Sequence, residues 1–138
     1  MPNKKILIVD DDQDVLQGLH VRLKANQYDI CLAVDAFSGV AEARRSAPDL
    51  ILLDLGLPAG GGFMVMDRLK MIPSLAIIPV IVVSARDGLG NQKRAFAAGA
   101  KAFLQKPVDD KRLLAVVRQA LGEPAVAKKP TLHDQGAV

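Results

Sequence analysis

ILIVDDD, residues 6–12, consists of four apolar residues followed directly by three aspartates. Ile6–Val9 is apolar on both faces of an extended chain, which is typical of a strand buried inside a parallel sheet. Leu16, Leu19 and Leu23 follow at helical spacing and indicate an amphipathic helix. The stretch therefore predicts a β-strand that ends in carboxylates and passes directly into a helix.

The same alternation of strand and helix continues through most of the chain. Four further strands are predicted, at Tyr28–Val34, Leu50–Leu53, Val80–Ser84 and Ala102–Leu104. Five such units favour an α/β fold, a doubly wound five-stranded parallel sheet flanked by five helices. We expect one domain over residues 4–122. Residues 123–138 show no periodicity and few large apolar side chains, which predicts a flexible tail or a truncated linker.

The composition excludes several classes of protein. The longest apolar runs fall far short of the ~20 residues that span a bilayer, and no secretory leader opens the chain. We therefore expect a cytoplasmic protein without membrane contact. A single cysteine excludes an internal disulfide and a Cys-cluster zinc site. Tryptophan is absent and aromatic residues make up 4%, so we expect no direct nucleic-acid binding by this chain.

Charged and polar residues follow the predicted strands where each strand ends. Asp10 and Asp11 follow the first strand, Asp54 follows the third, Ser84 ends the fourth and Lys106 follows the fifth. In doubly wound sheets the carboxyl ends of the strands meet at one edge, and ligands bind there. The sequence therefore predicts that these side chains converge on one site.

This set of side chains has the chemistry of phosphoryl transfer. Clustered carboxylates repel one another unless a cation joins them, and oxygen ligands beside water suit Mg²⁺. A lysine can pair with a phosphate, a hydroxyl can donate to it, and a carboxylate can accept the phosphoryl group. Asp12 lies beside the cluster, but we expect it to cap the following helix rather than to bind a metal.

Five short motifs, in this order, resemble the receiver domain of bacterial two-component response regulators. The motifs are ILIVDDD at 6–12, LDLGLP at 53–58 with Gly62 beyond it, PVIVVSA at 79–85, GA at 99–100 and FLQKP at 103–107. The resemblance covers nearly all of the predicted domain. It implies the flavodoxin-like receiver fold, with strand order 2-1-3-4-5.

The resemblance implies how phosphorylation would occur. Asp54 would accept a phosphoryl group from a sensor histidine kinase or a phosphotransfer protein. Mg²⁺ would be held by Asp10, Asp11, Asp54 and the backbone carbonyl of Gly56. The chain would then be a phosphorylation-dependent switch that changes its partner-binding face. Its partner would be a downstream protein or a fused output domain. It would not be an enzyme, although it would promote its own phosphorylation and dephosphorylation.

The resemblance also implies roles for the remaining motif residues in sensing the phosphoryl group and in setting the lifetime of the phosphorylated form. By the same resemblance, Ser84 would hydrogen-bond the phosphoryl group, Lys106 would pair with it, and Phe103 would be an aromatic switch that follows Ser84. Gly56 and Arg86 would flank the path of the attacking water and tune the lifetime of the phosphorylated form. The resemblance also implies a cis peptide bond between Lys106 and Pro107.

Two alternative functions belong to different classes. One is a protein-binding module that ignores phosphate, but such receivers lack an acidic residue or the lysine, and this chain retains all of them. The other is a Mg²⁺-dependent phosphatase with an aspartyl-phosphate intermediate. Enzymes of the haloacid-dehalogenase type carry a second aspartate two residues after the nucleophile, where this chain has Gly56.

We expect a monomer when the chain is unphosphorylated. Many DNA-binding relatives dimerise through the fourth helix, the fifth strand and the fifth helix, using an acidic pair after Gly-Ala. Here Lys101 follows Gly99-Ala100, and like charges across a two-fold interface repel. The segments around this face are basic and suggest an acidic partner or a domain beyond the tail. They carry Lys93, Arg94, Lys101, Lys111, Arg112 and Arg118.

Overall fold

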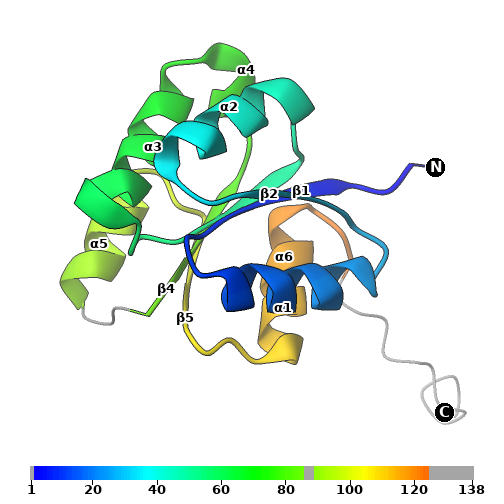
Figure 1. Ribbon diagram of the computed structural model, residues 1–138. Coiled ribbons are helices and arrows are strands. Elements are labelled where there is room, and N and C mark those ends of the chain that lie inside the picture. The colour runs from blue at the N-terminus through cyan, green and yellow to red at the C-terminus, as the bar shows by residue number, and fades with distance from the viewer. Residues whose placement is uncertain (1, 86–88, 125–138) are drawn as a thin grey trace, which may run out of the picture.

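A five-stranded parallel sheet forms the centre of the computed structural model, which describes residues 2–85 and 89–124 (Figure 1). Its strands lie close to the predicted ranges: β1 (Lys5–Val9), β2 (Asp29–Ala33), β3 (Leu50–Leu53), β4 (Val80–Ser84) and β5 (Ala102–Gln105). The spatial order is β2-β1-β3-β4-β5 and every neighbouring pair is parallel. The predicted fold class and strand order are therefore confirmed.

The five predicted helices are present, together with two short elements. The helices are α1 (Gln13–Lys24), α2 (Ala36–Ser46), α3 (Gly61–Lys70), α5 (Leu89–Ala97) and α6 (Asp110–Ala120). A 3₁₀ turn, η1 (Pro58–Gly60), precedes α3, and a four-residue helix, α4 (Pro73–Ala76), follows it. The sequence did not predict α4, because four residues are too few to show a helical period.

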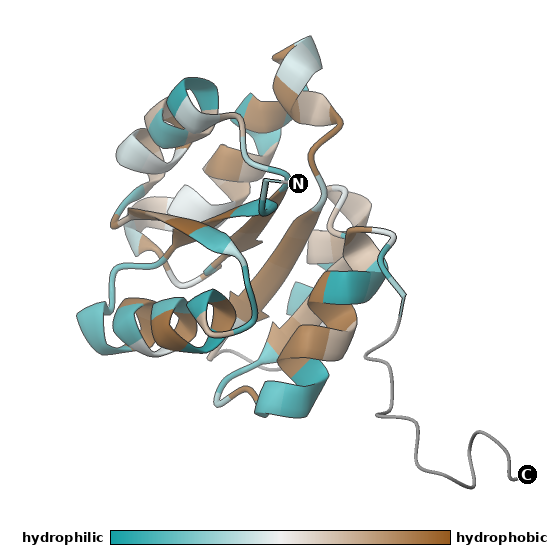
Figure 2. Ribbon diagram, turned by 90° about the vertical axis from the view of Figure 1, so that its right-hand side faces the viewer, coloured by the Kyte–Doolittle hydropathy of each residue, from teal (hydrophilic) through white to brown (hydrophobic). Residues whose placement is uncertain are grey.

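Two helical layers enclose the sheet, and the alternation of side chains along the strands divides the core between them (Figure 2). In β1, Leu7 and Val9 belong to the apolar cluster beneath α2, α3 and α5, whereas Ile6 and Ile8 pack with α1 and α6. β3 divides in the same way. Strands that are buried on both faces explain why their sequences are continuously apolar. No helix within the described residues has the length and apolar character needed to cross a bilayer.

Aspartates cap α1 and α6, which begin near the carboxyl edge of the sheet. The Asp12 carboxylate accepts hydrogen bonds from the N–H groups of Asp14 and Val15 at the start of α1, as expected. Asp109 accepts from the Arg112 N–H at the start of α6. Because such caps satisfy N–H groups that have no partner within the helix, they fix where each strand-to-helix turn ends.

The first residue of the expected tail still contacts the domain. The Glu123 N–H donates to the Arg118 carbonyl at 2.9 Å, beyond a Gly122 in the left-handed region. The Tyr28 hydroxyl donates to the Glu123 carboxylate at 2.7 Å. The predicted tail from residue 125 onward lies outside the described residues.

Candidate functional site

The site lies at the carboxyl edge of the sheet, where β1 and β3 end side by side. The two strands pair in register with Val9 opposite Leu53, so the next residues, Asp10 and Asp54, are neighbours. The Asp54 N–H donates to the Val9 carbonyl at 3.0 Å. Asp10 is 2% exposed and Asp54 is 5% exposed. The main-chain pairing of β1 and β3 thus holds the buried carboxylates of Asp10 and Asp54 next to each other.

A third carboxylate completes an acidic cluster. Asp10, Asp11 and Asp54 each offer a carboxylate oxygen, and the three oxygens lie within 4.8 Å of one another. Asp11 is exposed, whereas the other two are buried. A few oxygen donors on a partly open edge fit Mg²⁺, which prefers oxygen ligands and keeps several of its waters.

Lys106 follows the edge strand β5, and its side chain reaches this cluster. Its Nζ lies 2.6 Å from Asp10 Oδ2 and 3.7 Å from Asp54 Oδ2. The backbone N–H of Lys106 donates to the carbonyl oxygen of Ser84 at 2.9 Å. The peptide bond to Pro107 is cis, as the resemblance implied. The structure therefore brings Lys106 together with the predicted aspartates.

The environment of Asp54 makes its carboxylate more basic than usual. Burial raises the pKa of Asp54, and the negative charges of Asp10 and Asp11 raise it further. The Gly56 N–H, which donates to Asp54 Oδ1 at 2.9 Å, and the ammonium of Lys106 act in the opposite direction. A carboxylate that is desolvated but still anchored by hydrogen bonding is suited to act as a nucleophile.

Two glycines shape the loop that follows Asp54. A Cβ on Gly56 would lie 3.2 Å from Asp54 Oδ1 and 3.3 Å from Oδ2, so any side chain there would crowd the carboxylate. A Cβ on Gly62 would lie 2.7 Å from the Leu55 Cα and 2.8 Å from the Asp54 carbonyl oxygen. These contacts are with backbone atoms, so the first turn of α3 can approach the loop only where residue 62 lacks a side chain.

Gly62 is a residue whose importance the sequence did not reveal. It appeared there only as part of a motif, and nothing in the sequence placed α3 against the backbone of Asp54 and Leu55. The signal that could have found it is the glycine run that follows Pro58, because glycines permit close approach of backbones.

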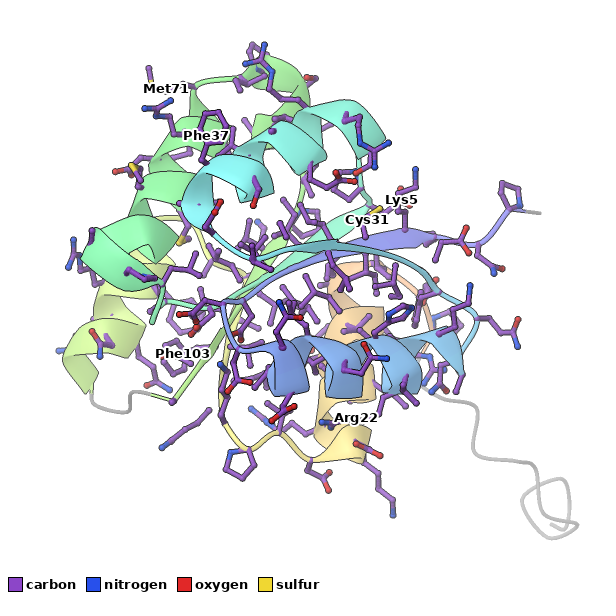
Figure 3. All side chains as sticks on the ribbon, viewed as in Figure 1. Lys5, Arg22, Cys31, Phe37, Met71 and Phe103 are labelled. Carbon is purple, nitrogen blue, oxygen red and sulfur yellow. The ribbon has the colours of Figure 1, made fainter. Side chains whose placement is uncertain are left out.

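Ser84 lies on β4, beside the strand of Asp54, and Phe103 lies on β5, the strand that precedes Lys106. Ser84 is fully buried at the end of β4, one residue beyond the level of Asp54, because Leu53 pairs with Val82. Phe103 on β5 is 8% exposed and belongs to the core cluster beneath α5 (Figure 3). Arg86 lies outside the described residues.

The basic residues expected on the face formed by α5, β5 and α6 divide into two groups. Lys93, Lys101, Lys111 and Arg112 are exposed. Arg94 is exposed too, and it lies over the ring of Phe63 on α3, with its guanidinium carbon 3.8 Å from the ring centroid. Arg118 is half-buried, and its charge acts on the phenol of Tyr28. The face is therefore basic, and five of the six residues supply exposed charge.

Comparison with known proteins finds a matching family model and similar relatives. Residues 6–118 match the family model described as "Response regulator receiver domain". Response regulator PleD of Caulobacter vibrioides is 40% identical over 114 residues, which are 83% of this chain and 25% of PleD. Protein PilH of Pseudomonas aeruginosa is 32% identical over 117 residues, covering 85% of this chain and 97% of PilH.

A solved structure has the same fold over nearly its whole length. The crystal structure of a putative response regulator from Chloroflexus aurantiacus superposes with a TM-score of 0.83 at 26% identity, covering 88% of this chain and 99% of that one. The chain thus spans nearly all of PilH but only a quarter of PleD.

Proposed function

Because the chain belongs to the response regulator receiver domain family, we propose that Asp54 accepts a phosphoryl group and thereby switches a partner-binding face. Receiver domains are signalling modules of two-component phosphorylation systems rather than classical enzymes. The observation that carries the proposal is the position of Asp54, a buried carboxylate within an acidic cluster, with the ammonium of Lys106 3.7 Å away.

The proposed phosphoryl donor is the phosphohistidine of a sensor histidine kinase or a phosphotransfer protein. A carboxylate oxygen of Asp54 forms a bond to phosphorus while the phosphorus–nitrogen bond of the donor breaks. The imidazole nitrogen leaves with the electron pair. The raised pKa of Asp54 strengthens this nucleophile, and the Gly56 N–H keeps the carboxylate oriented.

Mg²⁺ would be held by Asp10, Asp11 and Asp54, together with the backbone carbonyl of Gly56. Receiver domains bind this ion at an acidic pocket, and the three carboxylates of this chain fit it. When bound, Mg²⁺ offsets the negative charge shared by the carboxylates and the phosphoryl oxygens. Lys106, which already contacts Asp10, would pair with a phosphoryl oxygen from the other side.

The signal would pass through Ser84 and Phe103. The Ser84 hydroxyl would hydrogen-bond the phosphoryl group, and the side chain of Phe103 on the next strand would change rotamer in response. Gly56 would tune the lifetime of the phosphorylated form, because a residue without a side chain leaves the carboxylate open to water. Arg86, which lies outside the described residues, is proposed to share this role.

The output would be delivered to a downstream protein or a fused output domain through the basic face of α5, β5 and α6. The receiver domain would occupy residues 4–122, and the unphosphorylated chain would be a cytoplasmic monomer. Five exposed cations on this face would repel a second copy placed across a two-fold axis. A monomeric mass by light scattering before phosphorylation is the expected result.

Mass spectrometry of the intact chain after treatment with acetyl phosphate and Mg²⁺ tests the proposal. We expect an adduct of one phosphoryl group on the wild type and none on Asp54→Asn or in EDTA. An adduct on Asp54→Asn would overturn the assignment. Absence of an adduct on the wild type would favour a phosphate-independent binding module. Continuous phosphate release from p-nitrophenyl phosphate would favour a phosphatase.

A further inference from the structure

A groove between α2 and α3 lies outside the site described above. The two helices lie side by side in the layer opposite α1 and α6 (Figure 1). The groove has a volume of about 260 Å³. Phe37, Val40 and Arg44 line it from α2, and Met64 and Arg68 line it from α3.

The apolar side chains at the groove are exposed to an unusual degree. Phe37 is 86% exposed and points outward from α2, as Figure 3 shows, and Met64 is 44% exposed. The chain has only four phenylalanines, and each could bury a large apolar area in the core. The side chain of Phe37 is exposed instead, so it contributes little to the core. Aromatic residues, methionine and arginine are the types enriched in protein–protein interfaces, whereas lysine and acidic residues are depleted there.

The groove is also positively charged. Arg44 and Arg68 are exposed, and neither guanidinium has an ion-pair partner among the described residues. Two arginines outside the groove do form ion pairs, Arg45 with Glu42 and Arg22 with Asp110. None of the described residues that line the groove is acidic. The groove therefore carries two exposed positive charges with no acidic side chain in its lining, and an acidic ligand would complement them.

We propose that this groove binds an acidic segment of a partner protein that inserts one or two bulky apolar side chains. The volume is below the ~300–1,000 Å³ of small-molecule pockets and suits side chains of a peptide instead. The charge complementarity of Arg44 and Arg68 requires acidic residues beside the inserted groups. This surface is separate from the basic face of α5, β5 and α6, and the proposal does not rest on phosphorylation of Asp54.

Two other occupants fit the charge less well. The chain's own residues 125–138 carry two lysines and a single aspartate, so they would bring positive charge to Arg44 and Arg68. A second copy joined through this groove by a two-fold axis would place the same arginines opposite each other. An acidic partner is the occupant that relieves the charge rather than adding to it.

Selection of random peptides displayed on phage against the full-length chain tests the proposal. We expect enrichment of acidic peptides that contain a bulky apolar residue. Their affinity, measured by fluorescence anisotropy, should fall on the order of tenfold for Arg44→Glu with Arg68→Glu. It should also fall for Phe37→Ala. The matched control, Lys4→Glu with Lys24→Glu, changes two exposed lysines that line neither the groove nor the face of α5, β5 and α6. It makes the same change in net charge and should bind as the wild type does.

The outcomes distinguish the occupants. Equal loss of affinity in the groove and control variants, or no peptide that prefers the wild type over the groove variant, would overturn the proposal. A dimer that the groove variant abolishes would assign the groove to a second copy. Tighter peptide binding by a chain ending at residue 124 would assign it to the tail. Thermal unfolding and phosphoryl uptake should be unchanged in both pairs of variants, which shows that they fold.

Discussion

Lys106 Nζ is 2.6 Å from Asp10 Oδ2, which is closer than its distance of 3.7 Å to the Oδ2 of Asp54. The ammonium of Lys106 thus offsets the charge of Asp10 more than the charge of Asp54, the proposed phosphoacceptor. Asp54 keeps a raised pKa because it is buried beside two other carboxylates. The arrangement leaves one carboxylate of the cluster less stabilised as an anion, and that carboxylate is the one proposed to react.

Replacing Lys106 with methionine should destabilise the domain by about 2–3 kcal/mol. Asp10 is buried and would lose its charged partner, although partial exposure of Lys106 reduces the cost below that of a fully buried pair. Urea unfolding measures the change. Asp10→Asn in the Lys106→Met background should recover part of the loss, because it removes the unpaired charge. A Lys106→Met variant as stable as the wild type would contradict the importance of this pair.

Asp54→Asn should stabilise the domain without bound ions at neutral pH. The pKa of Asp54 is raised in the folded state, so the unfolded chain loses this proton at a lower pH and stability falls as pH rises between the two pKa values. The gain in Asp54→Asn should therefore be largest above the raised pKa, should shrink as the pH falls through it, and should vanish near a pH of about 4, where the carboxyl is protonated in both states. Thermal unfolding across this range checks the sign, and a gain that grows toward low pH would refute it.

Gly62→Ala should destabilise the domain by about 1–3 kcal/mol and slow phosphoryl uptake, because the new Cβ would press on the backbone of Leu55 and Asp54. The control is Gly18→Ala within α1, where the nearest atom is the end of the Arg22 side chain at 3.7 Å. That change should stabilise the domain by about 0.5–1 kcal/mol, since alanine favours helix. Equal effects of the two substitutions on urea unfolding would show that the close approach at Gly62 is unimportant.

Gly56→Ala should slow phosphoryl uptake from acetyl phosphate several-fold while leaving the fold intact. Its Cβ would lie against both oxygens of Asp54, but the loop faces the exposed edge of the site and has room to adjust. Hydrolysis of the phosphorylated form should slow as well, because water must approach past the same methyl group. Rates of both steps equal to those of the wild type would remove Gly56 from the mechanism.

Tyr28→Phe should cost about 1 kcal/mol of stability at neutral pH, because it removes the hydrogen bond to Glu123. Burial, and then the hydrogen bond to Glu123, raise the pKa of Tyr28 to about 12. The unfolded phenol ionises near pH 10, so this stabilisation is complete below that pH and is lost as pH rises toward 12. The stability difference between wild type and variant should shrink over this range, and a constant difference would contradict the linkage.

Glu123→Gln is the matched control for that prediction. The amide oxygen of glutamine can still accept the hydrogen bond from Tyr28, so the loss at neutral pH should be smaller than for Tyr28→Phe. A loss as large as that of Tyr28→Phe would show that the charge of Glu123, rather than the hydrogen bond, fastens the end of α6.

The sequence by itself determined the sheet, most of the helices and the chemical types at the site. Ile6–Val9 reads as a buried strand because both of its faces must be apolar, and Asp12 reads as a cap because short polar side chains satisfy the first N–H groups of a helix. Asp10, Asp54 and Lys106 could be placed at one edge because parallel strands all end on the same side.

Only the tertiary structure decided which of these groups touch. Lys106 pairs with Asp10 although β3 and β4 lie between their strands, and spacing along the chain does not encode that approach. The close approach of Gly62 to Leu55 and the groove beside Phe37 likewise arise where helices pack against segments remote in sequence. Local propensity depends on neighbouring residues along the chain, whereas contacts, burial and pKa values depend on neighbours in space.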